Sequence, residues 1–115
     1  MGEKLVKQSH PITVRDMQPT DENFIYSTWL KGMYYGNEFI RWIPEPSFLH
    51  NYRRVIRAIL GLPRVKVRVA CLADDHDAIL AYAVIEEQDK FQTLHWVFTK
   101  EAWRKMGVAK MLLPS

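Results

Sequence analysis

The spacing of apolar residues along the chain changes between the period of a strand and that of a helix. Residues 12–15 alternate apolar with polar side chains and predict a short strand, which the turn-rich stretch 16–20 closes. Apolar residues then recur at helical spacing as far as Gly36, and either Thr20 or Asp21 can cap this helix. The first part of the chain therefore predicts a strand followed by a helix.

A second helix is predicted for residues 47–60, because its apolar residues form one stripe and its charged residues lie opposite. Gly61 and Pro63 end this helix. Between the two helices, residues 35–47 form an aromatic segment with two prolines, which we expect to break regular structure. The aromatic side chains of this segment either pack over the edge of the core or face a ligand.

Three strands are predicted next, at residues 65–73, 78–87 and 91–98. The connections 74–77 and 88–90 are short enough for tight hairpins. The three strands are therefore expected to form an antiparallel meander.

A final helix of about eight to ten residues is predicted to begin near Met106. The resulting order, β-α-α-β-β-β-α, indicates an α/β (α+β) fold in which helices flank a mostly antiparallel sheet. We expect a single domain over residues 12–115, preceded by a flexible segment, residues 1–11. The side chains predicted to lie in its core are Trp29, Ile56, Val69, Val84 and Leu112.

The composition narrows the range of partners. Sixteen Lys and Arg residues against 13 Asp and Glu give a net charge of +3, which is too small for nucleic-acid binding by counterion release alone but suits a polyanionic small molecule. The single cysteine, Cys71, excludes an internal disulfide. No apolar run is long enough for a membrane span and residues 1–10 do not resemble a signal peptide, so we expect a cytoplasmic protein.

The most specific chemical signal lies in residues 93–113, where a strand, a turn and a helix follow one another. The turn Arg104-Lys-Met-Gly-Val-Ala109 places Gly107 where a larger side chain would block approach to the backbone. Consecutive amide groups at a helix start, together with the helix dipole and two cationic side chains, favour a bound anion. The segment therefore predicts a site for a pyrophosphate-bearing cofactor.

This segment resembles the pyrophosphate loop of the GNAT superfamily of acyl-CoA-dependent N-acyltransferases, which reads Arg/Gln-x-x-Gly-x-Gly/Ala after a strand. The match is Arg104-x-x-Gly107-x-Ala109, followed by Met111-Leu-Leu113. The order of the preceding elements also agrees, so the resemblance covers about residues 12–113. It implies a GNAT-like acyl-CoA-binding domain that uses acetyl-CoA (CoA) to acetylate an amine on a small molecule or a protein.

The resemblance also implies the roles of individual residues. Main-chain groups on the strand before the loop would bind the pantetheine arm, and backbone amides from Lys105 to Ala109 would bind the pyrophosphate. The amine would attack the thioester directly, and a general base would accept its proton. The candidates for this base are His95, Glu86 and Glu87, each of which has a structural or solvated role as its alternative. The implied cofactor-binding residues are Val97, Phe98, Thr99, Arg104, Lys105, Met106, Gly107, Val108, Ala109 and Lys110.

Two other functions stay open. GNAT members continue past their third helix with further strands and a helix, so we expect this chain to be truncated, or a partner chain to supply the other wall of the cleft. A non-catalytic module that binds CoA or oligomerises is therefore one alternative to the enzyme. The other is a nucleic-acid-binding module, which would use the arginines of the second helix and the aromatic segment and which the mixed acidic residues disfavour. These arginines are Arg53, Arg54 and Arg57.

The sequence also supports expectations about oligomeric state and metal binding. The fourth strand is expected to present an edge without a neighbour, carrying Leu94, Trp96 and Phe98, and such an edge pairs readily with another chain. A homo-oligomer formed through this edge is the expected assembly. The four histidines have no metal-ligand spacing, so no metal site is predicted.

Overall fold

A computed structural model describes residues 11–36 and 42–113 of the chain. The expected flexible segment, residues 1–11, falls outside the described residues except for Pro11, and so does the stretch 37–41 of the aromatic segment. In chain order the elements are β1 (Ile12–Asp16), η1 (Pro19–Asp21), α2 (Glu22–Gly36), α3 (Glu45–Leu60), β2 (Val65–Leu72), β3 (Asp75–Glu87), β4 (Gln92–Thr99), η3 (Glu101–Trp103) and α4 (Val108–Leu112). The predicted order of elements is confirmed.

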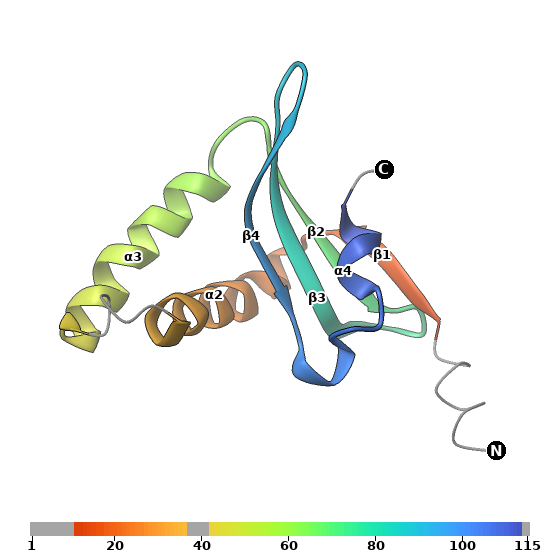
Figure 1. The fold of residues 1–115 in the computed structure, drawn as a ribbon, viewed down its shortest axis with the longest axis horizontal. Coiled ribbons are helices and arrows are strands. Elements are labelled where there is room, and N and C mark those ends of the chain that lie inside the picture. The colour runs from red at the N-terminus through yellow and green to blue at the C-terminus, as the bar shows by residue number, and fades with distance from the viewer. Residues whose placement is uncertain (1–10, 37–41, 114–115) are drawn as a thin grey trace.

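The strands form one antiparallel sheet in which sequence neighbours are also spatial neighbours, β1-β2-β3-β4 (Figure 1). Short hairpins join β2 to β3 and β3 to β4, as the spacing of the turn residues predicted. The register sets Val67 of β2 opposite Val84 of β3, and Val84 opposite Trp96 of β4. The predicted antiparallel meander is therefore confirmed, with β1 added at its outer edge.

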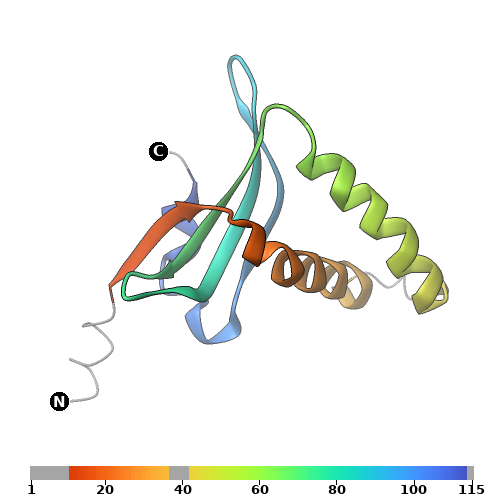
Figure 2. The same ribbon diagram turned by 180° about the vertical axis from the view of Figure 1, so that it is seen from behind.

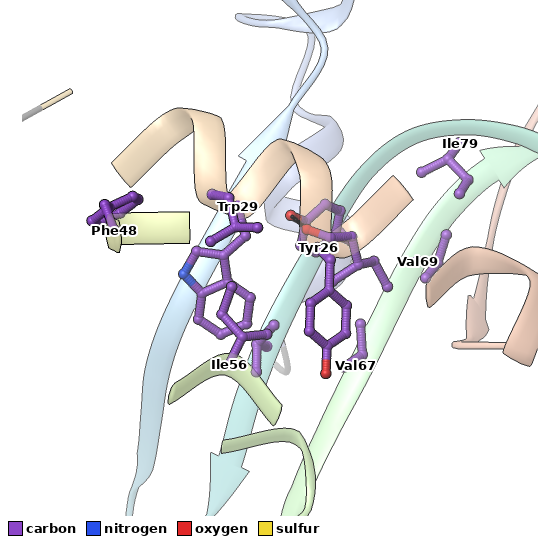
Figure 3. Close-up of a cluster of buried hydrophobic side chains, with 11 residues drawn as sticks. Tyr26, Trp29, Phe48, Ile56, Val67, Val69 and Ile79 are labelled. Carbon is purple, nitrogen blue, oxygen red and sulfur yellow. Dashed lines mark hydrogen bonds between the residues drawn. The ribbon is translucent and has the colours of Figure 1, made fainter. Parts of the chain in front are cut away.

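Helices cover both faces of the sheet (Figures 1 and 2). On one face, α2 and α3 bury Trp29 and Ile56 against β2 and β3, as Figure 3 shows. On the other face, the short α4 places Val108 and Leu112 against small side chains of β2 and β3. The alternation of side chains along the strands explains this division, because successive residues of β3 from Ala81 to Ile85 belong to opposite clusters.

The five side chains predicted to form the core are all buried, each with at most 1% of its surface exposed. They come from both helices of one face, from the two central strands and from α4. The sequence pattern therefore predicted correctly which face of each helix and strand is buried. These residues are Trp29, Ile56, Val69, Val84 and Leu112.

The start of α3 corrects one prediction. The helix begins at Glu45 and not at residue 47, with Pro44 at the N-cap position and Pro46 inside the first turn. Proline is tolerated there because the first helical N–H groups have no partner within the helix, and the fixed φ of proline suits a helix start. The second proline therefore belongs to the helix and does not break it.

Two further boundaries differ from the prediction. β3 begins at Asp75 and not at residue 78, so the hairpin turn consists of Ala73 and Asp74 alone. The last helix begins at Val108 and not at Met106, and it has 5 residues. β3 starts earlier because polar residues can extend a strand on a hairpin that projects into solvent. α4 starts later because the backbone at Gly107 is left-handed and cannot be helical.

Candidate functional site

The candidate site is built on β4, which has a neighbouring strand on one side only among the described residues. Its pairing with β3 is interrupted: Trp96 lies opposite Val84, but Leu94 lies opposite Ile85, so His95 has no partner. This extra residue is a β-bulge, which bends a strand and redirects its side chains. As a result Leu94 and Trp96 lie on opposite faces of the sheet, which the alternation of the sequence did not predict.

The bulge brings two of the three candidate bases together. Nε2 of His95 lies 2.8 Å from Oε1 of Glu86, and about a quarter of each side chain is exposed, 23% for His95 and 24% for Glu86. The third candidate, Glu87, instead lies 3.4 Å from Nζ of Lys66 at the surface. The geometry therefore joins His95 with Glu86 and leaves Glu87 apart.

Trp96, the residue after the bulge, anchors β4 to α2. Its indole stacks on that of Trp29, with ring centroids 5.8 Å apart and planes 5° from parallel. The backbone of Gly32 lies against this ring, because a Cβ atom at residue 32 would be 2.7 Å from Trp96. Gly32 was not among the predicted site residues, although a glycine in the middle of a helix signals a close approach by another group.

Tyr82 fixes the same part of the sheet from within. Its hydroxyl donates a hydrogen bond to the carbonyl of Ile25 at 3.0 Å and lies 2.7 Å from Oγ1 of Thr28. Burial raises the pKa of Tyr82 to about 12. The phenol therefore stays protonated near neutral pH and acts as a structural donor between α2 and β3.

The loop between β4 and α4 has an unusual backbone. Lys105 has a φ of 67° and Gly107 a φ of 77°, both in the left-handed region. Nε of Arg104 donates to the carbonyl of Thr99 at 3.1 Å and ties the loop back to the end of β4. No atom lies within 4 Å of the position that a Cβ atom would take at Gly107, so the space beside this residue is open.

The residues implied as cofactor ligands divide into two groups by burial. The side chains of Phe98 and Val108 pack inward, so only their main-chain groups are available to a ligand. Val97 is 39% exposed and Met106 is 50% exposed. The charged members of the set are exposed as well; they are Arg104, Lys105 and Lys110.

The arginines considered for nucleic-acid binding lie on α3, away from β4 and the loop after it. The guanidinium of Arg53 lies over the ring of Tyr26, 5.3 Å from its centroid, while Arg54 and Arg57 are exposed on α3. Within residues 11–36 and 42–113, no group of three or more His, Cys, Asp or Glu side chains could hold a metal ion. None of the helices in this part of the chain is long and apolar enough to cross a membrane.

Comparison with known proteins bears on the fold. No family model matches the sequence, and no curated protein matches it. A solved structure does: an acetyltransferase from Corynebacterium glutamicum, described as histone acetyltransferase HPA2 and related acetyltransferase, superposes with a TM-score of 0.53 at 19% identity, over 88% of this chain and 67% of the other. The chain therefore shares the fold of this acetyltransferase, and its antiparallel sheet with flanking helices is the α/β fold that the resemblance implied.

Proposed function

We propose that this chain binds acetyl-CoA along β4 and the loop that follows it, and that it transfers the acetyl group to an amine. The observation that carries the proposal is the loop from Arg104 to Ala109, in which the GNAT-like sequence pattern coincides with a left-handed backbone at Lys105 and Gly107 and with exposed residues at 104–107. The left-handed residues turn successive amides away from a regular helical path, and such turns form concave anion sites. The exposed Lys105 and Lys110 add positive charge for the phosphates.

The edge of β4 that has no neighbouring strand among the described residues supports binding of the pantetheine arm along this strand. A strand that pairs on one side only has main-chain donors and acceptors directed away from the sheet. Pantetheine contains amide groups that can pair with them in the manner of an added strand. Because β4 leads directly into the loop, a cofactor whose pyrophosphate lies at residues 105–109 would run back along the strand toward the bulge at His95.

The pair His95 and Glu86 would then act on the attacking amine. With Nε2–H of His95 donating to the Glu86 carboxylate, Nδ1 is left to accept the proton that the amine loses as its nitrogen attacks the thioester carbonyl. The carboxylate fixes the tautomer of the ring and stabilises the imidazolium that forms. The C–S bond breaks in the same reaction, and CoA leaves as the thiolate or thiol.

Calorimetric titration of the whole chain with CoA and with acetyl-CoA tests the cofactor site. Gly107→Trp should abolish binding, since its side chain would fill the open space beside the loop. Gly107→Asn is the matched control for backbone strain, because asparagine adopts a left-handed conformation more readily than other residues. Equal CoA affinity in the parent and in a folded Gly107→Trp variant would place the cofactor elsewhere.

The base is tested by acetyl transfer to a panel of amines at a series of pH values. His95→Ala should lower kcat by about a hundredfold or more without weakening CoA binding. Glu86→Gln should also lower kcat without weakening CoA binding, because the ring loses the carboxylate that fixes its tautomer. An unchanged kcat in both variants would show that the pair has only a structural role.

A further inference from the structure

A pocket on the β1–β2 side of the sheet plays no part in the proposed transfer reaction. It has a volume of about 460 Å³ and lies between the end of β1, the first half of α2, the end of α3 and the start of β2. Its size is within the range of small-molecule sites. Its apolar wall includes Met17, Leu60 and Val67. Figure 3 shows the ring of Tyr26 reaching toward Val67 with its hydroxyl leading.

Charges of both signs line this pocket. α2 and α3 run in opposite directions, and Arg53 of α3 lies over Tyr26 of α2 (Figure 1). One helical turn separates Glu22 from Tyr26 and likewise Arg53 from Arg57, so Glu22 and Arg57 are the next pair along the two helices. Both line the pocket, together with Asp16 of β1.

Among the described residues, no ion pair joins these opposite charges. Neither Glu22 nor Arg57 makes an ion pair or a side-chain hydrogen bond with another described residue, and the same holds for the carboxylate of Asp16. The other cation of the pocket, Lys66, is already 3.4 Å from Glu87. The pocket thus presents one exposed guanidinium and two exposed carboxylates that have no ion-pair partner among the described residues, together with an apolar wall.

We propose that this pocket binds a zwitterionic small molecule with an apolar body, namely an apolar amino acid or dipeptide. Its carboxylate pairs with Arg57, whose planar guanidinium suits bidentate recognition of a carboxylate. Its ammonium group lies beside Glu22 and Asp16, and its side chains contact the apolar wall. This binding does not depend on the proposed acetyl transfer, because none of the pocket residues belongs to β4 or to the loop after it.

The test is a titration of the isotopically labelled chain, without CoA, with leucine and with leucyl-leucine, followed by NMR. We expect amide resonances around the pocket to shift, with the loop at Gly107 unaffected. Blocking the amine as N-acetyl-leucyl-leucine, or the carboxylate as leucyl-leucine amide, should each weaken binding about tenfold, since each removes one charged contact.

Variants assign each contact. Arg57→Met should weaken the binding of leucyl-leucine about tenfold but leave the binding of leucyl-leucine amide unchanged. Glu22→Gln should also weaken the binding of leucyl-leucine about tenfold but leave the binding of N-acetyl-leucyl-leucine unchanged. Arg54→Met, an exposed arginine on α3 outside the pocket, is the matched control and should bind like the parent. The proposal is overturned if no probe shifts pocket resonances at millimolar concentration, or if blocked and free probes bind alike.

Discussion

At the scale of single residues, a buried ion pair joins β1 to η1, the turn that leads into α2. Arg15 donates from Nη1 to Oδ2 of Asp21 at 2.6 Å and from Nη2 to Oδ1 at 3.0 Å, and the amide of Gln18 donates to the same carboxylate at 2.7 Å. Only 4% of the Asp21 side chain is exposed. Arg15 also reaches the carbonyl of His76 at 2.7 Å, so one guanidinium connects three segments of the chain.

The pKa of Asp21 makes this contact dependent on pH. Burial of the carboxyl acts to raise its pKa, but hydrogen bonds from Arg15 and Gln18 outweigh burial, and the pKa lies below the ordinary value of 3.8. A carboxyl whose pKa is lower in the folded state stabilises the fold fully above its unfolded pKa. That stabilisation is lost as the pH falls below about 4 and through the lower folded value.

Asp21→Asn should therefore lower the free energy of unfolding by about 3 kcal/mol at neutral pH, because it leaves the Arg15 charge without a counterion. The free energy of unfolding should also decrease less between pH 5 and pH 2 in the variant than in the parent. The difference between the two decreases should be about the free energy that ionised Asp21 contributes. Urea unfolding at several pH values measures both. Asp89→Asn removes an exposed pair with Arg64 and should change stability by less than about 0.5 kcal/mol. Parallel pH curves for parent and Asp21→Asn would contradict the assignment.

At the scale of elements, the pattern of apolar residues predicted type and order well and boundaries less well. The strand alternation that buries Val69 and Val84 is a property of the sequence alone, whereas the bulge at His95 depends on how β4 fits its neighbour. Proline at residue 46 is compatible with a break or with a first helical turn, and the structure places it in the first turn of α3. The pairing of His95 with Glu86 could not be predicted for the same reason, since it depends on register.

The contact between α2 and β4 gives a test at this scale. Gly32→Ala places a methyl group 2.7 Å from Trp96 and should displace that ring from its stack on Trp29. Overpacking of this kind costs about 1 to 3 kcal/mol, partly offset by the better helix propensity of alanine. Chemical unfolding gives the cost, and near-ultraviolet circular dichroism reports the stacked indoles.

Gly36→Ala provides the matched control, because a Cβ atom at residue 36 would meet no atom within 4 Å. It removes a glycine from the same helix without touching Trp96, so it should be neutral or slightly stabilising. If both alanine variants change stability alike, the proximity of α2 to β4 at Gly32 is not a packing constraint.

At the scale of the whole molecule, apolar side chains stay exposed along β4 and around α4. Leu94 is 46% exposed, Met111 44% and Leu113 43%, in addition to Val97 and Met106. Exposed apolar groups next to a strand edge that has no partner strand in the described part of the chain indicate an association surface. The acetyltransferase fold was predicted from the order of elements and one loop, but no sequence pattern specifies which partner covers this surface.

We propose that the partner is a second copy of the chain, paired through β4. Light scattering over about a hundredfold range of protein concentration should show an average mass that rises from 13.6 kDa with concentration, as mass action requires. Val97→Lys should keep the protein monomeric, because a charge on a strand edge prevents pairing. Val55→Lys is the matched control, because this valine on α3 is 44% exposed against 39% for Val97 and should leave association unchanged when replaced. Saturating CoA should also shift the equilibrium toward monomer, since it would occupy the same edge.

A constant monomeric mass for the parent, or equal effects of the two lysine variants, would contradict pairing through β4.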